Sequence, residues 1–180
     1  VLGPLLALIY LNDLSNKVTN DVLFFADDTS LYSRHNTSNI ILIQQSLQTD
    51  LNSIFAYGQD WYITFNAKKT VMQTFTTKRE TQSPHLTFGG EPIPQETSHK
   101  HLGLTFSSDL RFHAHINELI QKVNRAMSPI FPIAKYLPRD VLNQLYKTYI
   151  LPYFDYSDVV YDGHLTHHDS RRLEVVQNRA

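Results

Sequence analysis

The fold of the first part of this chain depends on one stretch, Leu23-Phe24-Phe25-Ala26-Asp27-Asp28-Thr29-Ser30-Leu31-Tyr32. Four apolar residues lead into two adjacent aspartates, and a short apolar pair follows two residues later. This pattern predicts a β-hairpin whose tight turn carries both acids. Strand side chains alternate between faces, so Leu23 and Phe25 should share one face, and Phe24 and Ala26 the other. Both faces are apolar, so we expect both to pack against helices and the acids to lie at an exposed tip.

The two aspartates suggest a chemistry. Two adjacent carboxylates repel each other unless a cation neutralises them. A hard divalent cation with oxygen ligands does this, and Mg²⁺ is usual where phosphates are substrates. Two such ions assist an in-line phosphoryl transfer by activating the attacking hydroxyl and stabilising the leaving oxygen. The alternative is a polar turn without chemistry, because Asp is common in turns.

Phe25-Ala26-Asp27-Asp28 resembles the aromatic-x-Asp-Asp box of reverse transcriptases, and the Thr29 and Leu31-Tyr32 that follow resemble its version in non-LTR (LINE, jockey-like) retrotransposons. Three other stretches resemble boxes of this family in the same order, so that the resemblance covers essentially the whole chain. They are residues 1–14 (the end of motif B), 61–72 (motif D) and 100–104 (motif E). Four ordered boxes are more specific than any one of them.

The resemblance implies roles for individual residues. Asp27 and Asp28 would be the catalytic metal ligands, with Asp27 the principal one, because adjacent strand residues cannot point alike. Lys69, delivered by a turn at residues 66–68, would neutralise phosphate charge and protonate the departing pyrophosphate. An ordinary exposed lysine is the alternative. Nucleotide- and template-binding residues would be Gly3, Pro4, Phe25 and Ala26, and the primer grip would be Leu102 and Gly103, unless Gly103 is only a bulge glycine.

The implied fold is α+β: a truncated polymerase palm of antiparallel sheet and packed helices over residues 1–108, then an α-helical thumb over residues 109–180. Hydrophobic spacing predicts an amphipathic helix over residues 36–57, capped by Thr37 or Ser38. Strands are expected at residues 71–75 and 101–106, with a hairpin turn at Gly89-Gly90.

The second part of the chain has a helical pattern. One apolar stripe comprises Ile116, Leu119, Ile120, Val123 and Met127. A second helix should start near Pro138, and a third should be capped by Asp169 or Ser170. Residues 110–150 carry a net charge of +4, against −4 for residues 1–60. Solvated helix faces produce the same asymmetry, but a thumb would use such cations to hold nucleic-acid phosphates in a salt-sensitive way: Lys122, Arg125, Lys135 and Arg139.

Composition removes several classes of site. The chain has no Cys, which excludes disulfides and thiolate metal sites. Its longest apolar run, residues 5–11, is too short to span a membrane. The histidine pairs His113/His115 and His164/His168 have spacings that suit zinc, but structural zinc sites usually include thiolates.

The resemblance implies an RNA-directed DNA polymerase, a nucleotidyltransferase that uses two Mg²⁺ ions, an RNA template, a DNA primer and dNTPs. Nuclear and cytoplasmic locations are expected for the parent protein. The family needs one more Asp, from motif A, and the fingers, which both lie upstream of the first residue here. We therefore expect a C-terminal fragment that is inactive by itself. The alternative is an inactive or co-opted remnant that only binds nucleic acid or serves as a structural module.

Overall fold

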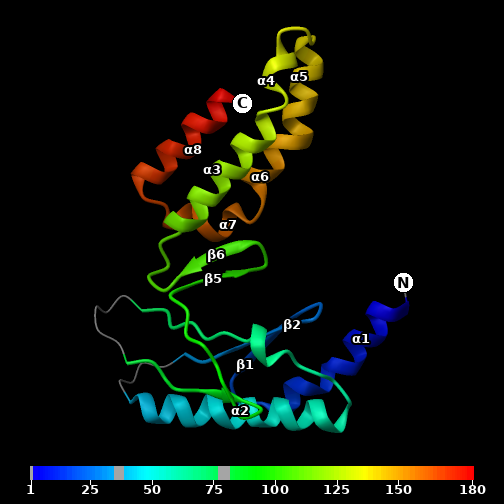
Figure 1. The fold of residues 1–180 in the computed structure, drawn as a ribbon, viewed down its shortest axis with the longest axis vertical. Helices are drawn as coiled ribbons and strands as arrows, with labels where there is room; N and C mark the ends of the chain where they lie inside the picture. The colour runs from blue at the N-terminus through cyan, green and yellow to red at the C-terminus, as the bar shows by residue number, and fades with distance from the viewer. Residues whose placement is uncertain (1, 35–38, 77–81) are drawn as a thin grey trace. The chain divides into compact units, whose positions relative to one another are not determined.

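The computed structural model describes residues 2–34, 39–76 and 82–180, which fall into two compact units (Figure 1). The first unit comprises the described parts of residues 1–72 and 78–96, and the second those of residues 73–77 and 97–180. Both units combine helices with short antiparallel sheets, so the fold class is α+β, as predicted. The strands of the described residues form three separate two-stranded sheets, where one palm sheet was expected.

The first unit is built around one long helix. Its elements are α1 (Leu2–Asn12), the 3₁₀ helix η1 (Asp13–Lys17), β1 (Asp21–Phe25), β2 (Asp28–Tyr32), α2 (Ile40–Asp60), the 3₁₀ helix η2 (Ala67–Lys69), β3 (Thr87–Phe88) and β4 (Glu91–Pro92). Residues from α2 and from the chain packed on it form the buried core: Leu14, Leu51, Ile54, Tyr57, Leu86 and Phe88. The apolar stripe of α2 therefore organises the unit that carries the paired acids.

Helix α2 begins at a side-chain cap. The Asn39 Oδ1 accepts hydrogen bonds from the backbone N–H groups of Ile41 and Leu42, which satisfies two of the free donors at a helix start. The predicted caps Thr37 and Ser38 lie outside the described residues. Farther along the helix, Gln48 both accepts from and donates to the Thr87 backbone, which holds β3 against α2.

The predicted acidic hairpin is confirmed. Strands β1 and β2 pair antiparallel, with Phe25 opposite Asp28, so the turn is the two residues Ala26 and Asp27. The turn therefore carries only one of the two acids, because Asp28 belongs to β2 and Ala26, expected in the strand, is the first turn residue. Only one face of the hairpin packs on the core, through Phe24 and Leu31. On the other face Leu23 and Phe25 are 59% and 62% exposed. The expectation that both faces pack is therefore wrong for the part of the chain that the structure describes.

Two other strand predictions need correction. Residues 71–75 do not form a strand, because their only β-type pairing among the described residues is an isolated bridge from Met72 to Gln95. The expected strand 101–106 is broken by a turn at Leu102-Gly103 into β5 (Ser98–His101) and β6 (Leu104–Ser107). The Gly89-Gly90 turn between β3 and β4 is confirmed.

The second unit joins the β5–β6 hairpin to a set of helices. They are α3 (His113–Met127), α4 (Phe131–Ala134), α5 (Arg139–Leu145), the π-helix η3 (Tyr146–Ile150), α6 (Leu151–Asp155), α7 (Asp158–Tyr161), the 3₁₀ helix η4 (Asp162–His164) and α8 (His167–Arg179). The predicted stripe of α3 is buried at Ile116, Leu119, Val123 and Met127, and Ile120 packs beside it. The same core contains Leu104 from β6 and Val176 from α8.

The start of α8 differs from its prediction. Thr166 is the cap, since its Oγ1 accepts from the Asp169 backbone N–H. Asp169 lies inside the helix, is 2% exposed, and accepts from Arg172 Nη1 at 3.2 Å. Its carboxylate also contacts His113 Nδ1 at 2.9 Å. The aspartate therefore ties α8 to α3 and does not cap the helix end.

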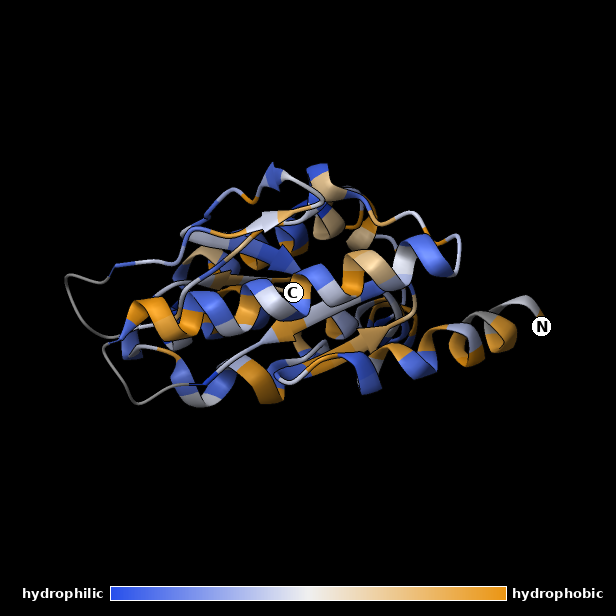
Figure 2. Cartoon of the chain, turned by 90° about the horizontal axis from the view of Figure 1, so that it is seen from below, coloured by the Kyte–Doolittle hydropathy of each residue, from blue (hydrophilic) through white to orange (hydrophobic). Residues whose placement is uncertain are grey.

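Helix α1 is apolar along its length, as Figure 2 shows by hydropathy. Leu2, Leu5 and Ile9 are more than half exposed. No helix in residues 2–34, 39–76 or 82–180 is both long and apolar enough to cross a membrane.

Candidate active site

The paired aspartates lie where the β1–β2 hairpin reverses. Asp27 is the second turn residue and Asp28 the first residue of β2, and both are exposed. The residue before them, Ala26, has a φ of 53°, in the left-handed region that favours glycine. A side chain in that region costs about 1 kcal/mol, and such strain is often found at functional sites. The turn thus presents two carboxylates from adjacent positions, on a backbone that is locally strained.

These carboxylates fit part of a magnesium site. In residues 2–34, 39–76 and 82–180 no ion pair joins Asp27 or Asp28 to a basic side chain, so their oxygens are available to a cation. Carboxylate oxygens are the ligands that Mg²⁺ prefers. Among the same residues, no group of three or more His, Cys, Asp or Glu side chains surrounds a common point. The described residues thus supply two adjacent carboxylates and no third ligand beside them, and the binding of Mg²⁺ by Asp27 and Asp28 stays a prediction.

The root of the hairpin is held by a buried carboxylate on α2. Asp50 is 1% exposed. Its Oδ1 accepts from Thr19 N at 2.9 Å and Thr19 Oγ1 at 3.0 Å, and its Oδ2 from Asn20 N at 2.7 Å and Asn20 Nδ2 at 2.8 Å. Burial by itself would raise the pKa of Asp50, but these hydrogen bonds outweigh it and hold the pKa below the usual value. The carboxylate is therefore ionised and saturated with donors.

Asn20 extends this contact to the other strand. Its Nδ2 also donates to Ser46 Oγ of α2 at 2.8 Å. Its Oδ1 accepts from Ser33 Oγ, just after β2, at 2.6 Å. Sequence reasoning missed this network. A signal was available, because Asp50 follows Leu47 by three residues and precedes Ile54 by four, which places an acid on the buried stripe of α2.

Lys69 lies at the end of the predicted turn. The Asn66 side chain accepts from the Lys69 N–H at 3.3 Å, and Thr70 Oγ1 donates to the Asn66 carbonyl at 3.1 Å. These bonds confirm the turn, as the 3₁₀ helix η2, and leave the Lys69 side chain exposed. No ion pair within the described ranges joins it to Asp27 or Asp28, so its catalytic role stays a prediction.

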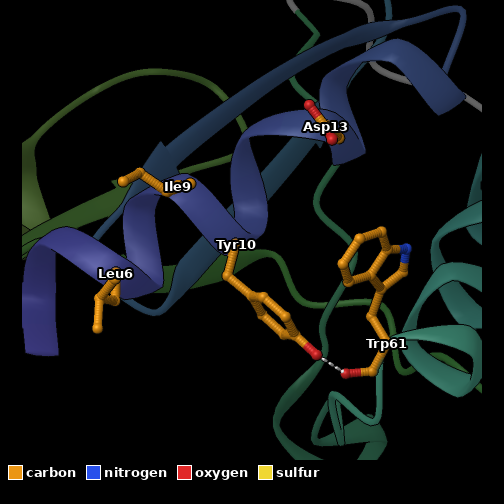
Figure 3. A pocket seen from close by; sticks show the side chains of 5 residues that line it. All are labelled: Leu6, Ile9, Tyr10, Asp13 and Trp61. Carbon is orange, nitrogen blue, oxygen red and sulfur yellow. Dashed lines mark hydrogen bonds between the residues drawn. The ribbon is translucent and has the colours of Figure 1, made fainter.

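Gly3 and Pro4, from the predicted motif B, lie in the first turn of α1. An open pocket of about 500 Å³ lies between α1 and the end of α2, lined by Leu6, Ile9, Tyr10, Asp13 and Trp61 (Figure 3). The Tyr10 hydroxyl donates to the Trp61 carbonyl, and the two rings meet edge to face at 5.3 Å. The Tyr57 hydroxyl donates to the Tyr10 carbonyl at 2.7 Å. These bonds fix α1 on the helix that also anchors the acidic hairpin.

The predicted primer grip is the turn of the β5–β6 hairpin in the second unit. Leu102 and Gly103 have φ values of 48° and 83°, as a tight two-residue hairpin turn requires. The Tyr156 hydroxyl donates to the Leu102 carbonyl at 2.8 Å. A Cβ on Gly103 would lie 3.1 Å from the Tyr156 ring. The bulge alternative is therefore wrong, since this is a turn glycine, and a tyrosine of the same unit lies against it.

The predicted phosphate-binding cations all belong to the second unit. Lys122 and Arg125 lie on α3, Lys135 directly follows α4, and Arg139 begins α5. Lys135 Nζ lies 4.8 Å from the centre of the Tyr136 ring. Their binding to nucleic acid stays a prediction.

The histidines of α3 contact other residues of the second unit. His113 contacts Asp169, and the buried His115 accepts from the Thr105 backbone N–H through Nδ1 at 3.4 Å. Burial lowers the pKa of His115, and Lys122 adds to this effect. His115 is therefore neutral near pH 7 and serves as a hydrogen-bond acceptor for β6.

Comparison with known proteins bears on residues 1–106, which match the family described as reverse transcriptase (RNA-dependent DNA polymerase). The matched region is more than half of the chain and contains the acidic hairpin, α1, η2 and the Leu102-Gly103 turn. No curated protein and no solved structure matches the chain. Since the family covers most of the sequence and includes every predicted catalytic residue, the chain belongs to the reverse transcriptases, the RNA-directed DNA polymerases.

Proposed function

We propose that this chain is the later palm and the beginning of the thumb of a non-LTR retrotransposon reverse transcriptase. The reaction would be the addition of deoxynucleotides to a primer 3′-OH on an RNA template. One observation carries the proposal: Phe25-Ala26-Asp27-Asp28 forms an exposed hairpin tip inside the region that matches the family.

Within this proposal, Asp27 and Asp28 hold Mg²⁺ together with an aspartate that precedes residue 1. The bound ions would supply activation of the primer hydroxyl and neutralisation of phosphate charge. Asp27, in the turn, is the principal ligand, and Asp28, in β2, shapes the site. Lys69 protonates the departing pyrophosphate, and its exposed position on η2 leaves its amine free to do so.

Other residues of the chain bind substrate and nucleic acid. The first turn of α1, with Gly3 and Pro4, contacts the nucleotide and template together with Phe25, at the end of β1, and Ala26, in the turn. The Leu102-Gly103 turn contacts the primer, and the cations of α3 to α5 hold phosphates of the template–primer duplex. Since these are sequence-independent contacts, binding should weaken as salt is raised.

The proposal predicts that the 180-residue chain alone does not extend a primer, because two carboxylates cannot complete the metal site. The test is primer extension with an RNA template, a DNA primer, dNTPs and Mg²⁺. It compares this chain with one that also carries the preceding segment of its parent protein. We expect product from the longer chain only, and a loss of about a thousandfold in the longer Asp27→Asn variant. Asp60→Asn, an exposed aspartate at the end of α2, is the matched control and should retain full activity.

Two results would contradict the proposal in different ways. Extension by the 180-residue chain alone would show that no upstream ligand is needed. A folded longer chain without activity, or an Asp27→Asn variant as active as the control, would favour the remnant, a module that binds nucleic acid without catalysis.

A further inference from the structure

We propose that Asp50 is a positioning residue: it fixes the direction in which the β1–β2 hairpin carries its paired aspartates. The inference deepens the proposed function, because the hairpin matters for catalysis only if Asp27 and Asp28 bind the metal. Asp50 belongs to the middle of α2, whereas the acids lie at the opposite end of the hairpin from the residues that Asp50 contacts.

The contacts of Asp50 select a carboxylate. Each oxygen accepts one backbone N–H and one side-chain donor, from Thr19 and from Asn20. An asparagine has a single acceptor oxygen and would turn an NH₂ group toward donors of one of these two residues. A glutamate is longer by one methylene, in a site where the carboxylate is 1% exposed. Only an aspartate at position 50 can therefore bind Thr19 and Asn20 at the same time.

The network joins the three chain segments that meet at the hairpin root. Thr19 and Asn20 immediately precede β1, Ser33 immediately follows β2, and Ser46 lies one turn before Asp50 on α2. Asn20 bonds to all three partners, Asp50, Ser46 and Ser33. Both strands are thus joined to α2 through Asn20. Farther from the root the hairpin packs on the core on one face only, through Phe24 and Leu31, whereas Leu23 and Phe25 on the other face are exposed.

The position of Asp27 and Asp28 depends strongly on the direction in which the hairpin leaves its root. Five-residue strands at about 3.3 Å per residue place the turn about 17 Å from Asn20. A tilt of about 10° at the root would then move the carboxylates by about 3 Å, against the ~0.5 Å tolerance of a catalytic constellation. Asp50 itself is no metal ligand, because it is buried and its oxygens accept four hydrogen bonds.

The test measures the direction of the hairpin without metal or nucleotide. The chain has no cysteine, so Leu23→Cys on the exposed face of β1 and Gln59→Cys on α2 give a unique spin-label pair. Electron–electron resonance yields their distance distribution in the otherwise unchanged chain, in Asp50→Asn and in the control Asp60→Asn. Circular dichroism checks that each variant is folded.

We expect one narrow distance in the unchanged chain and in Asp60→Asn, and a distribution about twofold broader or shifted in Asp50→Asn. A folded Asp50→Asn variant with the unchanged distribution overturns the proposal. If Asp50→Asn does not fold, Asn20→Ala decides, because it keeps the backbone bond to Asp50 but loses the side-chain bonds to Asp50, Ser46 and Ser33. It should broaden the distribution by a smaller amount, and an unchanged distribution again overturns the proposal. Failure of primer extension would leave this distance result standing, so the two proposals fail separately.

Discussion

The β1–β2 and β5–β6 hairpins, one in each unit, differ in how their turns are held. The β1–β2 hairpin is fixed at its root by Asp50, and its turn, Ala26-Asp27, is exposed. The β5–β6 hairpin is fixed at its turn, where Tyr156 bonds to Leu102 and packs against Gly103. Both are two-residue turns, with a positive φ at Ala26 in the first and at both Leu102 and Gly103 in the second.

The difference lies in what the turns carry. A turn that is covered by its own unit has its backbone groups satisfied and gains stability from packing. A turn that carries two carboxylates has to stay open if a cation and phosphates are to reach it, so its hairpin needs an anchor elsewhere. The buried carboxylate of Asp50 at the root is that anchor. Substitutions of Asp50 should therefore lower the stability of the hairpin strongly.

The largest predicted difference between the two hairpins is the cost of removing an anchoring carboxylate. Asp50→Ala should lower the opening free energy of β1–β2 by about 2–3 kcal/mol, because charged hydrogen bonds to two backbone N–H groups are lost. Glu118→Ala removes the acceptor for Thr105 Oγ1 and Lys100 at β5–β6. The Glu118 side chain is 42% exposed, so solvent screening should limit that cost to about 0.5–1 kcal/mol.

Hydrogen exchange of the strand amides measures both opening energies in one experiment. Each variant should affect mainly the hairpin that its residue contacts. If Asp50→Ala and Glu118→Ala lowered the opening free energies of their hairpins equally, burial of the Asp50 carboxylate would not matter for its anchoring role.

A smaller effect is predicted at the turns. Gly103→Ala places a Cβ at a φ of +83° and 3.1 Å from the Tyr156 ring, so the ring, which also bonds to Leu102, must shift by a few tenths of an ångström. We expect a loss of about 2 kcal/mol in thermal or denaturant unfolding of the second unit. Gly90→Ala, in the β3–β4 turn, is the matched control, because its φ is +88° and nothing lies within 4 Å of the new Cβ. This variant should lose only about 1 kcal/mol, because an alanine is unfavourable at a positive φ. Similar losses at both glycines would show that contact with Tyr156 does not stabilise the turn.

The two hairpins were not equally predictable from sequence. The β1–β2 hairpin has a polar pair between apolar runs, so the hairpin was predicted and its turn was located to within one residue. The β5–β6 hairpin was read as one strand, because residues 101–106 alternate in polarity across the turn. A left-handed Leu102 is also uncommon, so Leu-Gly gave no turn signal comparable to Gly89-Gly90.

Helices with an amphipathic period, such as α3, were predicted well because their stripe is a local property of the chain. The root network was not predicted, since it joins Thr19 and Asn20 to a residue 30 positions later. Binding of an acid by backbone N–H groups leaves no sequence motif. The binding of a metal by Asp27 and Asp28 stays a prediction, because two adjacent carboxylates at an exposed turn do not by themselves define a metal site.

The smallest predicted difference is in pH dependence. Burial lowers the pKa of His115, with Lys122 and Lys100 adding to the effect and Glu118 opposing it. A histidine with a lowered pKa stabilises the fold fully above the unfolded value of about 6.5, and this contribution is lost as the pH falls through the folded pKa. The β5–β6 amides, beside His115, should therefore lose protection from hydrogen exchange as the pH falls below about 6.5.

The β1–β2 hairpin should behave differently over the same range. The lowered pKa of Asp50 means that its contribution is complete above the unfolded value of about 3.9 and is lost only at lower pH. Between pH 5 and 7, with exchange rates corrected for intrinsic pH dependence, protection of β1–β2 should therefore stay constant while that of β5–β6 falls. In His115→Gln the side chain keeps an acceptor but cannot titrate, so the fall should disappear. If protection of β5–β6 still falls in His115→Gln, another titrating group of the second unit causes the pH dependence. The different pH dependence of the two hairpins could then not be attributed to His115.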